Sequence, residues 1–76
     1  MKELLEMIIK SLVADAESVS INEVQNEKTI TYEVKVAKND MGKVIGREGK
    51  IAKAIRTVIK AIASKEEKQV TVEFID

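Results

Sequence analysis

The sequence predicts an α+β fold in which helices cover one face of a three-stranded sheet. Apolar residues recur at helical spacing in some segments and alternate with polar residues in others. These segments follow one another in the order α-β-β-α-α-β. A chain of 76 residues has room for one domain, which we assign to residues 1–76. A helix layer packed on a sheet buries both kinds of apolar face.

The first helix is expected over residues 2–14. Its charged residues Glu3, Glu6 and Lys10 fall on the side opposite to an apolar stripe. That stripe comprises Leu4, Leu5, Ile8, Ile9 and Leu12. We interpret this helix as a cover for the core.

Two strands follow, over residues 19–25 and 29–37. The second alternates cleanly and places Tyr32 on the inward face, so we interpret Tyr32 as a core residue and not as a surface aromatic that binds a ligand. In the first strand Val24 is out of phase, which a bulge or an early end near Glu23 would explain.

The second half of the chain contains a short helix at 40–45, a loop at 46–49, a long helix at 50–63 and a strand at 70–75. The short helix is expected to be capped by Asn39 or Asp40. Gly42 within it suits close approach of the backbone to a ligand or close packing on the next helix equally well.

The loop Gly46-Arg47-Glu48-Gly49 has a composition that suits contact with phosphates. Glycine tolerates positive φ and lets another backbone come close. The first N–H groups of the following helix lack intrahelical partners and favour anions. Arg47 and Lys50 add positive charge beside them.

Charge is distributed unevenly, although the net charge is zero. Residues 35–60 contain eight Lys and Arg against two acids, a surplus of +6, while residues 1–34 and 61–76 carry −4 and −2. A basic face on a neutral chain suits a short piece of nucleic acid. The alternative is that these cations only solvate an exposed helix face.

Composition argues against catalysis. The chain has no Cys and no His, so it offers no thiolate nucleophile, no catalytic triad and no zinc site of the usual ligands. The Walker sequence is absent, since Ile51 stands where Ser or Thr would hold Mg²⁺. We therefore expect no enzyme, no metal and no cofactor. Apolar runs are too short for a membrane span and the N-terminus lacks a signal pattern, so we expect a cytoplasmic protein.

The segment Val44-Ile45-Gly46-Arg47-Glu48-Gly49-Lys50, with Ile55 further on, resembles the signature of KH domains, whose GXXG loop clamps about four nucleotides. The surrounding sequence MGKVIGREGKIAKAIRTVIKAI resembles the small single-domain bacterial KH proteins of the KhpA (YlqC) family. The element order also matches type II KH domains. One departure is Ala52, where many KH motifs have a large aliphatic residue.

The resemblance implies binding of single-stranded RNA in a groove beside the loop. Gly46 and Gly49 would approach the RNA backbone, and Arg47 and Lys50 would face phosphates. We expect Glu48 to point to solvent or to interact favourably with the N-terminus of the following helix. Lys43 and Lys53 would extend the positive field. An apolar floor under the bases would comprise Val44, Ile45 and Ile55, although Ile45 and Ile55 fit a plain core equally well.

The long helix carries more apolar surface than one sheet face requires. The candidates to cover the excess are the first helix, an apolar nucleic-acid groove and a partner subunit. We predict a dimer, through Ile55, Val58, Ile59 and Ile62. The resemblance implies homodimers, pairing with a larger KH-containing protein (KhpB, also called Jag or EloR), and a role as a post-transcriptional regulator or RNA chaperone in cell elongation and division. The alternative function is a protein-interaction adaptor in which the KH fold mainly serves assembly.

Overall fold

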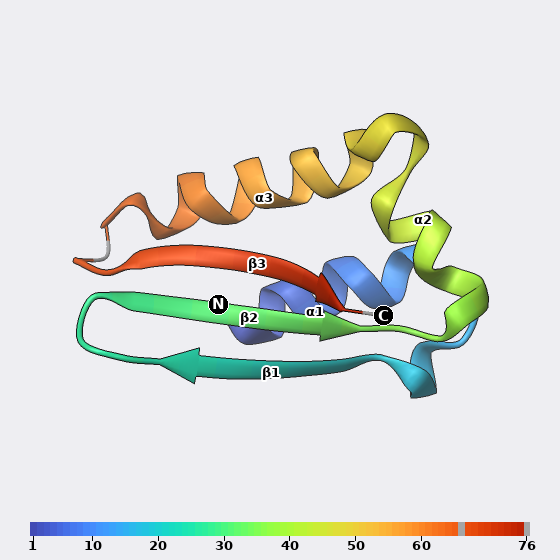
Figure 1. The fold of residues 1–76 in the computed structure, drawn as a ribbon, viewed down its shortest axis with the longest axis horizontal. Coiled ribbons are helices and arrows are strands. Elements are labelled where there is room, and N and C mark those ends of the chain that lie inside the picture. Colours follow the sequence, from blue (N-terminus) through green and yellow to red (C-terminus); the bar gives the residue numbers. More distant parts are fainter. Residues whose placement is uncertain (66, 76) are drawn as a thin grey trace.

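The computed structural model describes residues 1–65 and 67–75, and its elements follow the predicted order (Figure 1). Short 3₁₀ turns connect several of them. The helices and strands are α1 (Lys2–Leu12), β1 (Ser20–Gln25), β2 (Thr29–Lys35), α2 (Met41–Ile45), α3 (Lys50–Ile62) and β3 (Gln69–Ile75).

The three strands form one sheet in the order β1-β2-β3. The hairpin makes β1 antiparallel to β2, with Ile21 opposite Val34. The two-helix connection returns the chain so that β3 runs parallel to β2, with Tyr32 beside Val72. β2 is therefore the central strand, and β1 and β3 form the two edges.

The helices lie on one side of the sheet. In Figure 1, α1 passes behind the strands and α3 runs alongside β3. Side chains from α1, α2, α3 and all three strands meet between the layers. Tyr32 is among them, as its phase in the strand predicts. The buried core comprises Leu5, Ile9, Ile21, Tyr32, Val34, Val44, Ile55, Ile59, Ala63, Val70 and Val72. This arrangement confirms the predicted α+β fold class.

The structure differs from the sequence prediction at two places in the first half. α1 ends at Leu12, before residue 14, because Val13 is extended and the next two N–H groups bond to the side chain of Asp40. β1 pairs with β2 in unbroken register from Ser20 to Gln25, so both the bulge and the early end near Glu23 are wrong. Val24 simply faces solvent on the open side of the sheet, 46% exposed.

Smaller differences concern the ends of the other elements. β2 stops at Lys35, the residue opposite the first residue of β1, so its pairing ends there. α3 ends at Ile62, since the chain tightens into a 3₁₀ turn at Ala63. Within the part of the chain that the structure describes, none of the helices combines the length and the apolar character that a membrane span needs.

Candidate nucleic-acid interface

The turn from α2 into α3 is built from residues with positive φ. Gly46 has φ 76° and ψ 176°, Gly49 has φ 75° and ψ 15°, and between them Glu48 has φ 59° and ψ 23°. The N–H of Gly49 donates to the carbonyl of Gly46 at 3.2 Å and closes the turn. Glu48 is the one non-glycine residue with positive φ in the described chain. The backbone therefore reverses within four residues at the outer end of the molecule.

The two loop glycines are required for different reasons. A Cβ on Gly46 would lie 2.6 Å from Cγ1 and 2.9 Å from Cβ of Ile51, so α3 packs directly against this residue. A Cβ on Gly49 would meet nothing within 4 Å, so only its left-handed backbone favours glycine. Gly42 has the same open surroundings with a helical backbone, so close packing on the next helix does not account for it.

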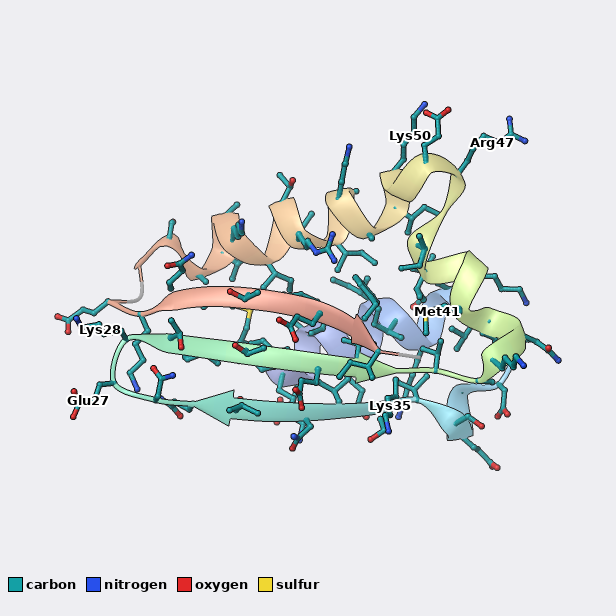
Figure 2. All side chains as sticks on the ribbon, in the orientation of Figure 1. Glu27, Lys28, Lys35, Met41, Arg47 and Lys50 are labelled. Atoms are coloured by element: carbon teal, nitrogen blue, oxygen red, sulfur yellow. The ribbon has the colours of Figure 1, made fainter. Side chains whose placement is uncertain are left out.

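The charged side chains of the loop stand in solvent. Arg47, Glu48 and Lys50 are exposed. Figure 2 shows Arg47 and Lys50 extending outward from the turn where α3 begins. α3 has no side-chain cap, so its first N–H groups are not used by a neighbouring side chain. The N–H of Lys50 itself donates to the carbonyl of Arg47. Two exposed cations and the positive end of the α3 dipole thus share this end of the molecule.

Lys43 is in a different position from the loop cations. Its Nζ lies 3.1 Å from Oδ1 of Asp40, three residues earlier on the chain. About half of the Lys43 side chain is exposed, whereas Asp40 is almost fully buried. Part of the charge that the sequence assigns to RNA is therefore balanced inside the protein.

Among the residues that the structure describes, Asp40 is the one charged residue that is buried, with 2% of its surface exposed. Its side chain does not cap α2, contrary to the expected cap. Oδ1 accepts the N–H of Ala14 at 3.1 Å and Oδ2 accepts the N–H of Asp15 at 3.0 Å. These bonds, that of Asp15 first, hold the pKa of the Asp40 carboxyl below its usual value. Asp40 thereby ties the end of α1 to the start of α2.

The apolar residues assigned to the groove floor divide into two groups. Val44 is fully buried and Ile55 is 5% exposed, so both belong to the core. Ile45 is half-buried and packs at the margin of the core. The expectation that Val44 and Ile55 face a ligand therefore needs correction: they support the surface from beneath, because α2 and α3 turn these positions toward the sheet.

Arg56 makes two contacts with β3 that the sequence does not predict. Its Nε donates to the carbonyl of Val72 on β3 at 3.1 Å. Its guanidinium lies over the ring of Phe74, with Cζ 5.5 Å from the ring centroid. A carbonyl on the edge strand is thus satisfied by α3. Only the place of Arg56 at the margin of the helical apolar stripe hints at this role in the sequence.

The residues assigned to a dimer interface also divide. Ile55 and Ile59 face the core, at 5% and 1% exposure. Val58 and Ile62 are 45% and 47% exposed, one turn apart on the same side of α3. Ile51 continues this line at 37% exposure. The surplus apolar surface of the helix is therefore present, with Val58 and Ile62 in it and Ile55 and Ile59 behind it.

Other parts of the described chain offer little chemistry. In residues 1–65 and 67–75 there is no group of three or more Asp and Glu side chains close enough to hold a metal ion. A surface depression follows the exposed side of α1 and includes no residue of the loop 46–49. It is lined by Glu3, Glu6, Met7, Lys10 and Ser11.

Comparison with protein families and curated proteins gives matches along nearly the whole chain. The family model of the KhpA/KhpB KH domain matches residues 2–74. A protein named RNA-binding protein KhpA from Clostridium perfringens is 61% identical over 75 residues, covering 99% of this chain and all of that protein. Its namesake from Listeria monocytogenes is 45% identical over 76 residues, covering both chains completely.

Among solved structures, the chain resembles part of Era, crystallised with MgGDPNP and nucleotides 1506–1542 of 16S ribosomal RNA. The TM-score is 0.61 at 17% sequence identity, and the match covers 96% of this chain and 30% of Era. At this identity the likeness concerns the fold alone.

Proposed function

This chain belongs to the KhpA/KhpB family of KH domains, and from that membership we propose that it binds single-stranded RNA, about four nucleotides at a time, through the loop 46–49. The observation that carries the proposal is the shape of the turn, with three positive-φ residues between α2 and α3 and exposed Arg47 and Lys50 beside them. The name RNA-binding protein that the relatives carry supports the same ligand.

In this proposal each loop residue has a distinct task. The positive φ of Gly46 and of Gly49 shapes the turn that meets the RNA backbone. Arg47 and Lys50 contact phosphates, and the positive end of the α3 dipole favours the same anions. Glu48 points to solvent. Lys43 and Lys53 contribute at longer range, and Ile45 supplies apolar contact, supported from the core by Val44 and Ile55.

We further propose that the protein acts as a dimer in the cytoplasm and has no enzymatic activity. The exposed Val58 and Ile62 support a second copy on α3. Few aromatic residues are available for base stacking, so two linked domains would gain affinity through effective concentration. By its family we assign it to post-transcriptional regulation or RNA chaperone activity linked to cell elongation and division, with a larger KH-containing protein as an alternative partner.

A second candidate is a protein-interaction adaptor. The same exposed apolar line on α3 favours it, because this surface has no partner in the described chain. An adaptor tolerates acidic side chains in the loop 46–49, whereas an RNA-binding protein does not.

The deciding experiment is fluorescence anisotropy with a short unstructured RNA at low and moderate salt. The test variant is Arg47→Asp/Glu48→Asp, which keeps both glycines, and Asp suits the positive φ of position 48. A matched control is Lys2→Asp/Glu3→Asp in the exposed first turn of α1. We expect the loop variant to lose binding while circular dichroism shows a native spectrum, and the control to bind as wild type does. Equal binding by all three proteins would rule out the loop as the clamp.

A further inference from the structure

The polar side of α3 carries a line of lysines that begins at the loop. Lys50, Lys53 and Lys60 are all exposed, and with Thr57 they follow one another at intervals of three or four residues. On a helix this spacing places them along one side. We call Lys50, Lys53 and Lys60 the lysine stripe. Lys50, at the loop end of the stripe, points away from the sheet in Figure 2.

The fold leaves the charge of the stripe unbalanced. α3 contains no acidic residue that could pair with these lysines along the helix. The two ion pairs found in the described part of the chain lie elsewhere, between Lys10 and Glu6 and between Lys43 and Asp40. The remaining cation of α3, Arg56, is directed toward β3 by its bond to Val72.

The placement of these charges also opposes the stability of the helix itself. The N-terminus of a helix favours acidic side chains and disfavours basic ones. α1 follows this rule, with Glu3 in its first turn and Lys10 in its last. α3 breaks it, because Lys50 and Lys53 stand in its first turn and that turn contains no acidic residue. Local conflicts of this kind are expected where a ligand supplies the missing partner.

We propose that RNA leaving the loop continues along the lysine stripe, so that the phosphates of the adjoining nucleotides lie on the outer side of α3. This inference rests on the proposed RNA binding, since the loop anchors the strand at Lys50. From Lys50 to Lys60 the helix rises ~15 Å. At a spacing of about 3.4 Å per stacked nucleotide, this length accommodates at most about four phosphates. The complete binding site then holds more nucleotides than the loop alone does.

The test compares a 5-nucleotide with a 12-nucleotide unstructured RNA, using fluorescence anisotropy over a range of salt concentrations. The variant is Lys53→Gln/Lys60→Gln. Its matched control is Lys2→Gln/Lys35→Gln, which removes the same charge from exposed positions on α1 and β2. Each variant is compared with wild type on the same RNA, so the number of possible binding frames cancels. Circular dichroism establishes that all proteins are folded.

We expect Lys53→Gln/Lys60→Gln to bind the longer RNA roughly fivefold to tenfold more weakly than wild type, with a salt slope lower by about 1.4 for two lost phosphate contacts. On the shorter RNA the loss should be clearly smaller, about twofold to threefold, because there Lys53 acts only at longer range and Lys60 lies beyond the strand. The control should match wild type on both RNAs. Equal losses on the two RNAs, or an equal loss in the control, would overturn the extended path.

The proposed clamp and the extended path fail in different ways. If Arg47→Asp/Glu48→Asp binds the shorter RNA normally, the clamp is wrong whatever the stripe does. If that variant loses binding but Lys53→Gln/Lys60→Gln binds the longer RNA as wild type does, the clamp stands and the path is wrong. After that second result, the lysine stripe would be tested as a binding surface for an acidic protein.

Discussion

Gly46 lies so close to Ile51 that a Cβ on the glycine would sit 2.6 Å from Cγ1 and 2.9 Å from Cβ of the isoleucine. The same glycine has φ 76° and ψ 176°, a conformation almost confined to glycine. The first loop residue is therefore fixed both by its backbone and by its contact with α3.

This contact predicts unequal effects of alanine at the two loop glycines. Gly49→Ala should lower the free energy of unfolding by about 1–2 kcal/mol, the cost of a left-handed backbone. Gly46→Ala should lower it further, by roughly 2–4 kcal/mol, since the new Cβ also overlaps Ile51. Urea unfolding followed by circular dichroism measures both values.

The control for this comparison is Ile51→Ala. In the Gly46→Ala background it removes Cγ1 and Cδ1 but leaves the Ile51 Cβ, so it should restore part of the lost stability. Equal losses at Gly46 and Gly49, or no coupling between positions 46 and 51, would contradict the packing described for the turn.

Gly42 offers the opposite case. It has a helical backbone, and a Cβ there would meet nothing within 4 Å. Gly42→Ala should therefore raise the free energy of unfolding by about 0.5–1 kcal/mol. RNA affinity, measured in parallel, decides the function of this position: an unchanged affinity means that the backbone at Gly42 does not meet RNA. A destabilised Gly42→Ala protein would count against the helical assignment of α2.

Asp40 predicts a dependence of stability on pH. Its pKa is lower in the folded chain than in the unfolded one, because the N–H groups of Asp15 and Ala14 stabilise the carboxylate. The unfolded chain therefore binds the proton more tightly. The stability that Asp40 supplies is complete above the unfolded pKa, near 3.8, and is lost as pH falls through the folded pKa.

The corresponding experiment is thermal unfolding of wild type and Asp40→Asn from neutral to acidic pH. We expect the variant to melt several degrees lower at neutral pH, since an amide cannot accept both N–H bonds as a carboxylate does. The gap should narrow as pH falls below about 4. Asp15→Asn is a suitable control, because its exposed carboxylate accepts only the hydroxyl of Ser18 in the described chain. A gap that stays constant with pH would exclude the charge of Asp40 as its cause.

The fold and the position of the loop can be predicted from the sequence, because both depend on local patterns. Alternation in β2 and the helical stripe of α3 fix which faces meet, and Tyr32 accordingly lies in the core. The prediction at Val24 is wrong because a single apolar residue on a solvent face resembles a break in the alternation. Its register with Thr31 shows that the strand is regular.

The parts of the site that could not be predicted depend on contacts between distant segments. Asp40 bonds to N–H groups 25 and 26 residues away, and no local pattern encodes that distance. Arg56 reaches β3 across the layer between helix and strand. Val44 and Ile55 carry the motif, but only the packing of α2 and α3 shows that their side chains face inward.

The ion pair of Lys43 predicts a graded contribution of the basic residues to RNA binding. Lys43 is already partly neutralised by Asp40 at 3.1 Å, whereas Arg47 has no ion-pair partner within the described residues. Arg47→Gln should therefore weaken RNA binding about fivefold or more, and Lys43→Gln about twofold or less. Anisotropy titrations at one salt concentration compare the two variants directly. A larger loss for Lys43→Gln would mean that RNA displaces Asp40 from the lysine.

The last prediction separates the two kinds of apolar residue on α3. Val58→Ser/Ile62→Ser changes only exposed side chains, so the fold should be kept while any dimer dissociates. Ile59→Ala leaves the outer surface intact but opens the core, and should lower the free energy of unfolding by about 2–5 kcal/mol.

Sedimentation equilibrium at micromolar concentration and urea unfolding together distinguish these effects. We expect wild type and Ile59→Ala, under conditions where the latter is folded, to have the mass of a dimer, and Val58→Ser/Ile62→Ser to have that of a monomer. Because two linked domains bind RNA more tightly than one, the monomeric variant should also bind RNA more weakly with its loop unchanged. A wild-type chain that is monomeric at this concentration would contradict the dimer, and would make Val58 and Ile62 the first residues to test against a different protein partner.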